Sequence, residues 1–474
     1  MLFIYVNLAK SVIALPYGIQ SNHVTVLTLI RVHRLFNIVN MTDSSRDSSE
    51  AAASLEVAIV GGGVIGVMMA LGLHHRGIKA VIYERAPTYH EVSAGFAFTG
   101  SGRECMEKLH PGILEVLSKI SQKTDADTSN SYWDAFHPKT KEDAEDESKS
   151  LLFRTPNNKL DYWGCVRSQL LLGCAEQLPE GNIVFGKQLM SYDDDNENDK
   201  VILHFDDGTT ATADVLLGCD GIHSNTRKNM LSADHPASRA GYTHIVAYRT
   251  MVPIEAGIAA LGDKVAQSGC MHTGPNACLM SYPVMNGTLL NVAIFAYDPE
   301  DFPDPVRMTA SAHRSEIEHL FEGWGPHLAD IWKLYPETLV KWGLFDMEQN
   351  PPPTYANGRV CIVGDAAHAS TPFLGVGACT GVEDALVLCT VLESVQENTP
   401  TALSAALQTY NKARLDRGHW VHRASRGVGE MCQWRYGPTG RDPERMKAKL
   451  EKNAHQAVLF DVLGALEAVS VSQP

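Results

Sequence analysis

The chain lacks the cysteine and histidine patterns that bind metal ions. Its ten cysteines include no Cys-x-x-Cys pair and no Cys/His cluster at metal-ligand spacing. Cys219, Cys361 and Cys389 stand inside apolar runs, where a thiol behaves as a small buried hydrophobic group. We therefore expect reduced cysteines in a reducing compartment, and no metal site.

Basic residues are scarce relative to acidic ones. The 40 Lys and Arg stand against 55 Asp and Glu, which gives a net charge of −15. A nucleic-acid partner needs a basic face, and an anionic membrane holds proteins through basic segments. We expect neither partner. A hydrophobic content of 44% and a charged content of 20% are those of a globular protein with two or three domains.

No apolar run is long enough for a confident membrane span. Residues 1–40 contain no Asp or Glu and are rich in Leu, Ile and Val. Such a segment is typical of a transit peptide or a weak anchor, or of a start placed upstream of Met41. The polar stretch from Met41 to Ser54 is typical of a disordered N-terminus. We expect a cytoplasmic protein with residues 1–54 outside its fold, and a targeting role as the alternative.

A strand, a helix and a second strand are predicted between residues 56 and 84. The strand Glu56–Gly61 precedes a helix at Val64–Arg76, which Gly77 ends, and Lys79–Tyr83 is again strand-like. This order is one βαβ unit.

Gly61, Gly63 and Gly66 have the spacing of a dinucleotide-binding turn between this strand and helix. The first glycine permits the tight turn, the second lets the backbone approach a pyrophosphate, and the third allows close helix packing. Glu84 ends the second strand, 23 residues after Gly61, where its carboxylate can accept ribose hydroxyls. The pattern fits NAD or FAD and disfavours NADP at this position.

The rest of the chain alternates between helical and strand-like patterns. Helices are predicted at 101–120, 166–177, 376–393 and 401–431, and strands within 182–217, 241–297 and 360–363. A charged loop is predicted at 141–150 and a solvated hairpin tip at 193–199. The domain prediction is an extension at 1–54, a discontinuous nucleotide-binding domain at 55–125, 155–235 and 355–400, a β-rich substrate domain at 236–354 and C-terminal helices at 401–474.

Two later segments add to the glycine-rich turn. Asp220 to Arg227 follows the apolar run 215–217 and contains Asp-Gly-x-x-Ser-x-x-Arg. Gly364 to Gly377 contains Gly-Asp followed by a run of small residues that leads into a helix. With these three ordered motifs the chain resembles the class A flavoprotein aromatic hydroxylases, such as salicylate and para-hydroxybenzoate hydroxylases, over residues 55–430. It is most similar to their fungal polyketide-tailoring subgroup, such as the 3-methylorcinaldehyde hydroxylases.

The resemblance implies an α/β fold in which a Rossmann-like FAD-binding domain is interrupted by a mostly antiparallel β-sheet domain, with helices at the C-terminus. It implies tightly bound, non-covalent FAD, NADPH or NADH as a transient co-substrate, and O₂. Asp365 matches the residue that receives the ribityl hydroxyls. Ala369 and Val376 depart from the usual Pro and Gln. The cofactor-binding set that follows is Gly61, Gly63, Gly66, Glu84, Arg85, Gly95, Arg167, Asp220, Asp365, Pro372, Gly375, Gly377 and Ala378.

Arg249 and Tyr282, 33 residues apart on two predicted strands, match an Arg and a Tyr that act on the substrate phenolate in this subgroup. A cation in a dry pocket would lower the pKa of a phenol and make its ring more nucleophilic. The alternatives are an Arg249 that pairs with a carboxylate and a Tyr282 in the core. His368 is interpreted as structural, and His223 is given no catalytic role.

The predicted function is FAD-dependent hydroxylation of a phenolic, polyketide-derived metabolite through a flavin C4a-hydroperoxide. The product is a catechol or hydroquinone where the attacked carbon bears hydrogen, and a dearomatised dienone where it bears an alkyl group. A flavin-dependent epoxidase of an alkene or indole, a decarboxylating salicylate-type hydroxylase and a non-catalytic FAD-binding protein remain alternatives. A small aromatic molecule is the expected partner, and the protein is expected to be a monomer or homodimer.

Overall fold

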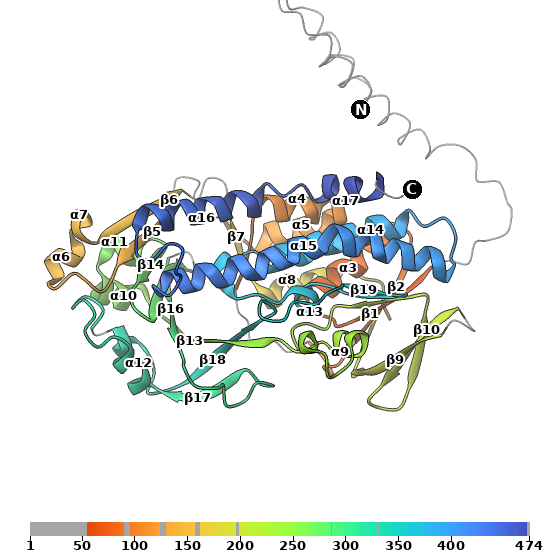
Figure 1. Cartoon of the computed structure of the whole chain (residues 1–474), viewed down its shortest axis with the longest axis horizontal. Coiled ribbons are helices and arrows are strands. Elements are labelled where there is room, and N and C mark those ends of the chain that lie inside the picture. The colour runs from red at the N-terminus through yellow and green to blue at the C-terminus, as the bar shows by residue number, and fades with distance from the viewer. Residues whose placement is uncertain are drawn as a thin grey trace, which may run out of the picture. The chain divides into compact units, whose positions relative to one another are not determined.

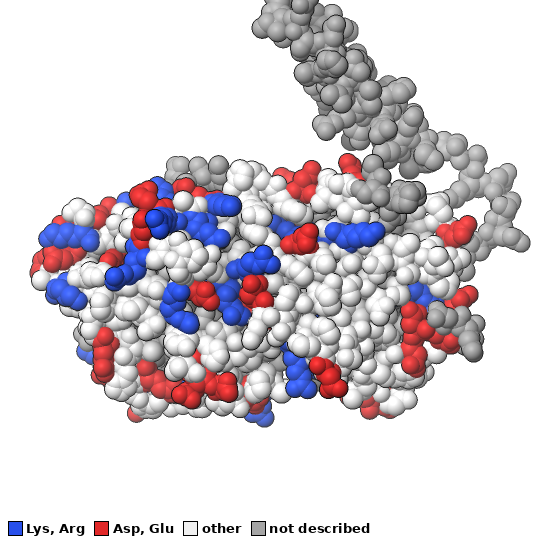
Figure 2. Space-filling model, in the orientation of Figure 1, with Lys and Arg blue, Asp and Glu red and all other residues white. Residues whose placement is uncertain are grey.

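The computed structural model describes residues 55–89, 95–123, 129–156, 162–195, 199–285, 287–329 and 331–471 (Figure 1). The predicted extension at 1–54 lies outside these residues. None of the helices in the described ranges carries an apolar stretch long enough to cross a lipid bilayer. On the face drawn in Figure 2, the basic side chains alternate with acidic ones and do not gather into one basic surface.

A six-stranded sheet forms the first half of the fold. Its order is β19-β20-β12-β1-β2-β8, and every pair is parallel except β19–β20. The strands are β1 Glu56–Val60, β2 Lys79–Glu84, β8 Ile183–Phe185, β12 Val215–Gly218, β19 Ala356–Asn357 and β20 Val360–Ile362. The central strands are buried, as a parallel sheet covered on both faces requires.

Helices from distant parts of the chain share one core on this sheet. They include α3 Val64–His75, α8 Arg167–Ala175 and α14 Gly377–Glu393. The βαβ unit and the helices at 166–177 and 376–393 are therefore confirmed, with bounds that differ by one or two residues.

A second sheet of eight strands runs in the order β17-β18-β13-β16-β15-β14-β5-β6. All its pairs are antiparallel except β14–β5. The strands are β5 Ser129–Asp134, β6 Leu151–Pro156, β13 Gly241–Pro253, β14 Cys270–Thr273, β15 Ala277–Val284, β16 Leu289–Tyr297, β17 Thr309–His313 and β18 Thr338–Asp346. The predicted antiparallel sheet is thus confirmed, and it also recruits residues 129–156 from an earlier part of the chain.

The two faces of this sheet carry separate cores. One face packs against α10 Ile254–Leu261, α11 Asp263–Ala266 and α12 Arg314–Leu320. The other packs against the end of α15 Pro400–Cys432 and against α16 Pro443–Val458. The last helix, α17 Val462–Val471, returns to α14 and α15.

The helix α15 connects the two halves of the fold. Its 33 residues correspond to about 50 Å of helix. Leu407 and Tyr410 belong to the core of the parallel sheet, and Val428 and Met431 belong to that of the antiparallel sheet. Figure 1 shows this helix extending from α14 and β19 at one end to β14 and β16 at the other.

The prediction of a single helix over 101–120 is wrong. The structure has α4 Gly100–Leu109 and α5 Pro111–Ile120. Proline has no N–H to continue the first helix, and His110 between the two is extended, with its side chain accepting a hydrogen bond from the backbone N–H of Gly112.

The predicted charged loop at 141–150 is also wrong, because it folds as α6 Lys141–Glu145 and α7 Glu147–Ser150. Thr140 and Asp146 cap the two turns by accepting the backbone N–H groups of Asp143 and Ser148. The hairpin tip predicted at 193–199 is shorter than expected, since β9 Leu189–Asp195 extends through the first three of these residues. Residues 196–198 lie outside the described part.

Two small sheets complete the fold. One has the order β11-β10-β9, with β10 Lys200–Phe205 and β11 Thr210–Ala213. The other, β3-β7-β4, consists of β3 Gly95–Phe98, β7 Trp163–Val166 and β4 Gln122–Lys123.

Candidate active site

The glycine-rich turn joins β1 to α3. Gly61 has a φ of +103°, and a Cβ there would lie 2.4 Å from the carbonyl oxygen of Cys219. A Cβ on Gly66 would lie 2.0 Å from the carbonyl oxygen of Gly61, so helix and strand approach too closely for any side chain. Gly63 caps α3 without a side-chain hydrogen bond. The first N–H groups of α3 are therefore available to an anion.

Glu84 closes the turn from the next strand. Its carboxylate accepts hydrogen bonds from the backbone N–H groups of Gly62, at 2.6 Å, and of Ala86, at 2.8 Å. Arg85, the next residue after Glu84, is exposed. The carboxylate is thus held at the carboxyl end of β2, beside the start of α3.

The Gly-Asp motif meets the first turn of α3. A Cβ on Gly364 would lie 3.7 Å from the Ile65 side chain, and one on Gly381 of α14 would lie 2.8 Å from it. Ile65 therefore lies against both segments, and two motifs separated by about 300 positions in the sequence are neighbours in the fold.

Asp365 begins the short helix α13 Asp365–His368 and is exposed. The protein around it desolvates the carboxylate and raises its pKa, while His368, Arg167 and Arg227 oppose that shift. An exposed but desolvated carboxylate is what the wall of a recess provides.

Arg167, the first residue of α8, enters the same recess. Its guanidinium would lie 3.7 Å from a Cβ on Gly63 and lies over the Phe96 ring at 5.8 Å. Burial lowers its pKa, and the charges of Asp365 and Glu84 oppose that change. Gly95 pairs with Val166, so it lies beside the start of α8. The structure thus brings Gly63, Glu84, Arg167 and Asp365 together.

The small-residue run forms the 3₁₀ turn η4 Pro372–Leu374 and the start of α14. Ser425 of α15 holds this turn, because its hydroxyl accepts the N–H of Leu374 at 3.1 Å and donates to the carbonyl of Thr371 at 2.5 Å. Pro372 and Gly375 are exposed, and α14 begins after Val376 without a side-chain cap. Its first N–H groups, from Gly377 and Ala378 onwards, are available to a ligand.

The two departures from the family pattern do not face this recess. Ala369 and Val376 are each 2% exposed and belong to hydrophobic clusters. Their side chains serve packing, and the backbone donors of the loop are unchanged.

The Asp-Gly motif lies at the start of α9 Asn225–Leu231. Asp220 accepts hydrogen bonds from the Ser224 hydroxyl at 2.5 Å and from the backbone N–H and hydroxyl of Thr226 at 2.9 and 3.1 Å. Arg227 is fully buried and donates to the carbonyl oxygens of Ala366 and Ile222 at 2.7 and 2.6 Å. These contacts fix the motif against α13.

A buried ionic network, not predicted from the sequence, lies beneath the Gly-Asp loop. Asp384 accepts from the backbone N–H of Gly364 at 3.0 Å and contacts His368 at 2.6 Å and Arg414 at 2.7 Å. Glu383 pairs with Arg414 and with Arg417 of α15. The structural interpretation of His368 is confirmed. The signal available in the sequence was the adjacent acidic pair inside the otherwise apolar helix 376–393.

Arg249 and Tyr282 lie on one face of the antiparallel sheet. Arg249 of β13 pairs with Ala293 of β16. On the other side of β16, Tyr282 of β15 pairs with Asn291, two residues from Ala293. Directly paired residues and alternate residues share a face. The two side chains therefore point to the same side. Burial raises the pKa of Tyr282, and the charge of Arg249 opposes that shift.

This face is the one that meets the Pro372 turn. Phe295 follows on the same face, and its ring centroid lies 4.7 Å from that of Phe373 in η4. Ala247 pairs with Phe295, and Arg249 is two residues further along β13, about 7 Å. Arg249 is thus two residues along β13 from Ala247, which pairs with the residue that contacts η4.

Both side chains keep access to solvent. Arg249 is exposed and, among the described residues, has no carboxylate or hydrogen-bonding partner. Tyr282 is 37% exposed, yet the surrounding protein raises its pKa, so the hydroxyl is protonated and can donate. The alternative in which Arg249 pairs with a carboxylate of the described chain is not what the structure shows.

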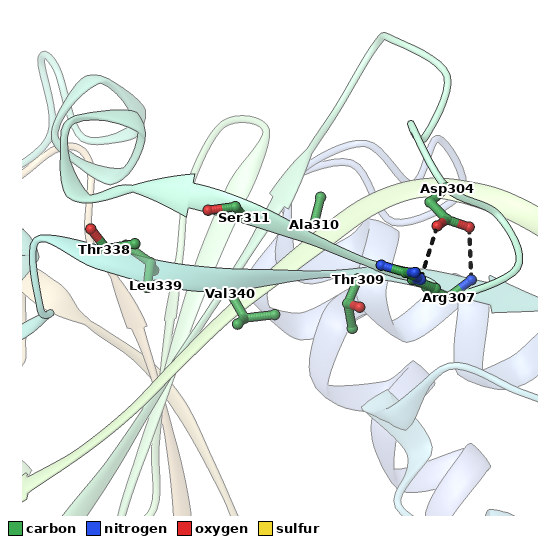
Figure 3. A pocket seen from close by; sticks show the side chains of 8 residues that line it. All are labelled: Asp304, Arg307, Thr309, Ala310, Ser311, Thr338, Leu339 and Val340. Carbon is green, nitrogen blue, oxygen red and sulfur yellow. Dashed lines mark hydrogen bonds and ion pairs between the residues drawn. The ribbon is translucent and has the colours of Figure 1, made fainter.

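A shallow hollow lies further along the same sheet face, on β17 and β18. It is lined by Thr309, Ser311 and Val340, and it is bordered by the ion pair between Asp304 and Arg307 (Figure 3). None of the motif residues lines it.

Fold and motifs together define a class: an α/β protein with a nucleotide recess facing an antiparallel sheet. The FAD binding domain family matches residues 54–425, and the chain belongs to this family. It is an enzyme, a FAD-dependent monooxygenase of the fungal aromatic hydroxylase kind.

Two curated fungal relatives illustrate the similarity. A FAD-dependent monooxygenase of Aspergillus terreus is 47% identical over 87% of this chain and 95% of its own length. Salicylate hydroxylase asL1 of Sarocladium schorii is 38% identical over 87% of this chain and 90% of its own length. A solved salicylate hydroxylase substrate complex is similar in fold, with a TM-score of 0.76 and 27% identity over 88% of this chain and 98% of that one.

The residues present fit FAD. Two helices begin at the recess without side-chain caps, and the desolvated Asp365 carboxylate lies between cations. Glu84 would accept hydrogen bonds from the ribose hydroxyls, and Asp365 would accept them from the ribityl hydroxyls. The start of α3 would hold the pyrophosphate. When bound, the flavin supplies redox chemistry with a reduced nicotinamide and O₂.

Proposed function

We propose that the protein hydroxylates a phenolic, polyketide-derived ring, using NADPH or NADH as the reductant. The observation that carries the proposal is the placement of Arg249 and Tyr282 on the sheet face that contacts η4. A cation and a hydroxyl donor thereby face η4 and the start of α14, whose free backbone N–H groups we propose to contact the flavin ring.

The two side chains have complementary tasks toward a phenol. Arg249, without an ion-pair partner among the described residues, stabilises the phenolate and so lowers the pKa of the substrate. Tyr282, kept protonated by its raised pKa, donates a hydrogen bond to the same oxyanion. Both side chains are open to solvent in this structure, and a bound ring would displace that water and strengthen both interactions.

The test is substrate-dependent oxidation of NADPH with orcinol and salicylate as probes. For Arg249→Ala we expect kcat/KM to fall about 30- to 150-fold, which corresponds to roughly 2–3 kcal/mol of lost transition-state stabilisation. Flavin content should be unchanged, and Arg249→Lys should retain part of the activity. Arg307→Ala, at a cation whose side chain is 81% exposed, is the matched control.

Turnover of the phenols within about threefold of the unaltered enzyme would contradict the phenolate role, since that is only about 0.7 kcal/mol. The mass of the product separates the alternatives. With the phenolic probes, addition of one oxygen identifies hydroxylation, and addition of one oxygen with loss of CO₂ identifies a decarboxylating enzyme. Indole, added as a third probe, is oxidised only if the enzyme is an epoxidase. A yellow protein that oxidises no NADPH with any probe would be a FAD-binding protein without turnover.

A further inference from the structure

Exposed apolar side chains gather around Arg249. Nine large apolar side chains are exposed in the described part of the chain. Strand register places four of them on the Arg249 face: Met251, Tyr282, Val340 and Trp342. Nearly half of the exposed apolar side chains thus share one sheet face, which marks it as a binding surface.

Methionines form the part of this surface next to Tyr282. Met251 is 64% exposed and pairs with Asn291, the residue that also pairs with Tyr282. Met280 is linked to Arg249 through Ala293. Met285 is 55% exposed in the turn after β15, beyond the paired strands, so it extends the row past Tyr282 without being assigned to the face by register. We call Met251, Met280 and Met285 the methionine strip.

The charge in the middle decides what fits this surface. Arg249 has no partner among the described residues, so a wholly apolar occupant would bury an unpaired cation. The same face of a second copy would add another unpaired Arg249 instead of an anion. An amphipathic molecule satisfies both parts. Its anion meets Arg249, and its apolar part covers the strip, where flexible thioether side chains adapt to a chain of variable shape.

We propose that the substrate is an anionic aromatic ring that carries a flexible aliphatic chain. The ring lies at Arg249 and Tyr282, and the chain runs along the methionine strip toward the β15–β16 turn. This inference rests on the proposed function for the position of the ring, and it adds the chemical class of the substituent.

The experiment measures affinity as a function of chain length. The holoenzyme is titrated with 5-alkylresorcinols from methyl to pentyl, and binding is followed by the fluorescence of the bound flavin. We expect the dissociation constant to fall about threefold for each added methylene, close to the value for full burial of a methylene.

In the double variant Met251→Ala, Met285→Ala, the gain for each methylene should fall below about 1.5-fold, while the methyl compound binds within twofold of the unaltered enzyme. Met190→Ala, at a methionine that is 53% exposed on β9, should leave the dependence on length intact.

Four results would overturn the inference. The dissociation constant could be independent of chain length, or no member of the series could bind. Alternatively, the dependence on chain length could survive in the double variant, or it could be abolished by Trp342→Ala instead. A dimer that the double variant dissociates, with the length dependence intact, would assign the strip to a contact between copies. Failure of the proposed function looks different. The affinity would then rise with chain length and depend on the strip, but no ring would be hydroxylated.

Discussion

For Asp365, the sequence predicts the local position, and the structure adds the charged groups around it. Its motif is local, so the sequence predicts its proximity to a helix start. The sequence does not show that Arg167 and Arg227, distant along the chain, lower its pKa against the effect of burial. Likewise Arg249 and Tyr282 could be paired only through the resemblance, because their common face depends on the register of β16 between them.

At the residue scale we predict that Asp365→Ala weakens FAD binding by about 10- to 150-fold, the value of a hydrogen bond to a charged group. Asp365→Asn should bind at an intermediate level because its amide oxygen still accepts. Flavin absorbance of the purified protein and titration of the apoprotein measure both. Asp304→Ala, in the exposed loop before β17, is the control, and normal flavin content in Asp365→Ala would remove the ribityl assignment.

Single elements were predictable where their signals are contiguous. The strand β1 and the helix α3 follow from an apolar run and a glycine pattern, whereas α6 and α7 were missed although Thr140 and Asp146 are readable capping residues. The acidic pair Glu383-Asp384 stands out in its apolar helix, but its pairing with Arg414 was not predictable, because the partners lie 30 positions apart in different helices. Only the packing of α15 on α14 makes them neighbours.

At the element scale we predict that Arg414→Met destabilises the protein by about 3–5 kcal/mol. The substitution leaves two carboxylates buried, at 4% and 0% side-chain exposure, with only Arg417 on Glu383 and only His368 on Asp384 as basic partners in the described part of the chain. Urea unfolding of the holoenzyme measures the loss. Lys412→Met, at an exposed position of the same helix, should change stability by less than about 0.5 kcal/mol; equal effects of the two substitutions would contradict the prediction.

At the scale of the whole molecule, a buried histidine of the antiparallel sheet, His272, lies close to the half-buried His327. His272 of β14 is 2% exposed, and neither of its ring nitrogens has a hydrogen-bond partner in the described part of the chain. Its ring lies 5.9 Å from that of His327. Burial lowers the pKa of His272 to about 3 and that of His327 to about 4. Both are neutral in the folded protein at physiological pH.

Stability should therefore depend on pH in a defined direction. An unfolded histidine binds a proton below about pH 6.5, while folded His272 does not. The stability that neutral His272 contributes is therefore present above about pH 6.5 and is lost as the pH falls toward the folded pKa. At pH 4.5 the free energy of unfolding has lost about 2–3 kcal/mol of this contribution. The free energy of unfolding of His272→Leu should fall less between pH 7 and 4.5 than that of the unaltered protein. His455→Leu, on the surface of α16, should follow the unaltered protein, and parallel curves for all three would refute the assignment.

The long helix α15 has a consequence for how the enzyme is made. The parallel sheet takes β1, β2 and β8 from early in the chain and β20 from late, and Ser425 holds the loop that precedes α14. A nascent chain cannot complete this cofactor site until residues near the end of α15 have left the ribosome. Loading of the flavin is then a late event, and a cell short of riboflavin would accumulate full-length apoprotein that lacks the stabilisation of the bound cofactor and is degraded first.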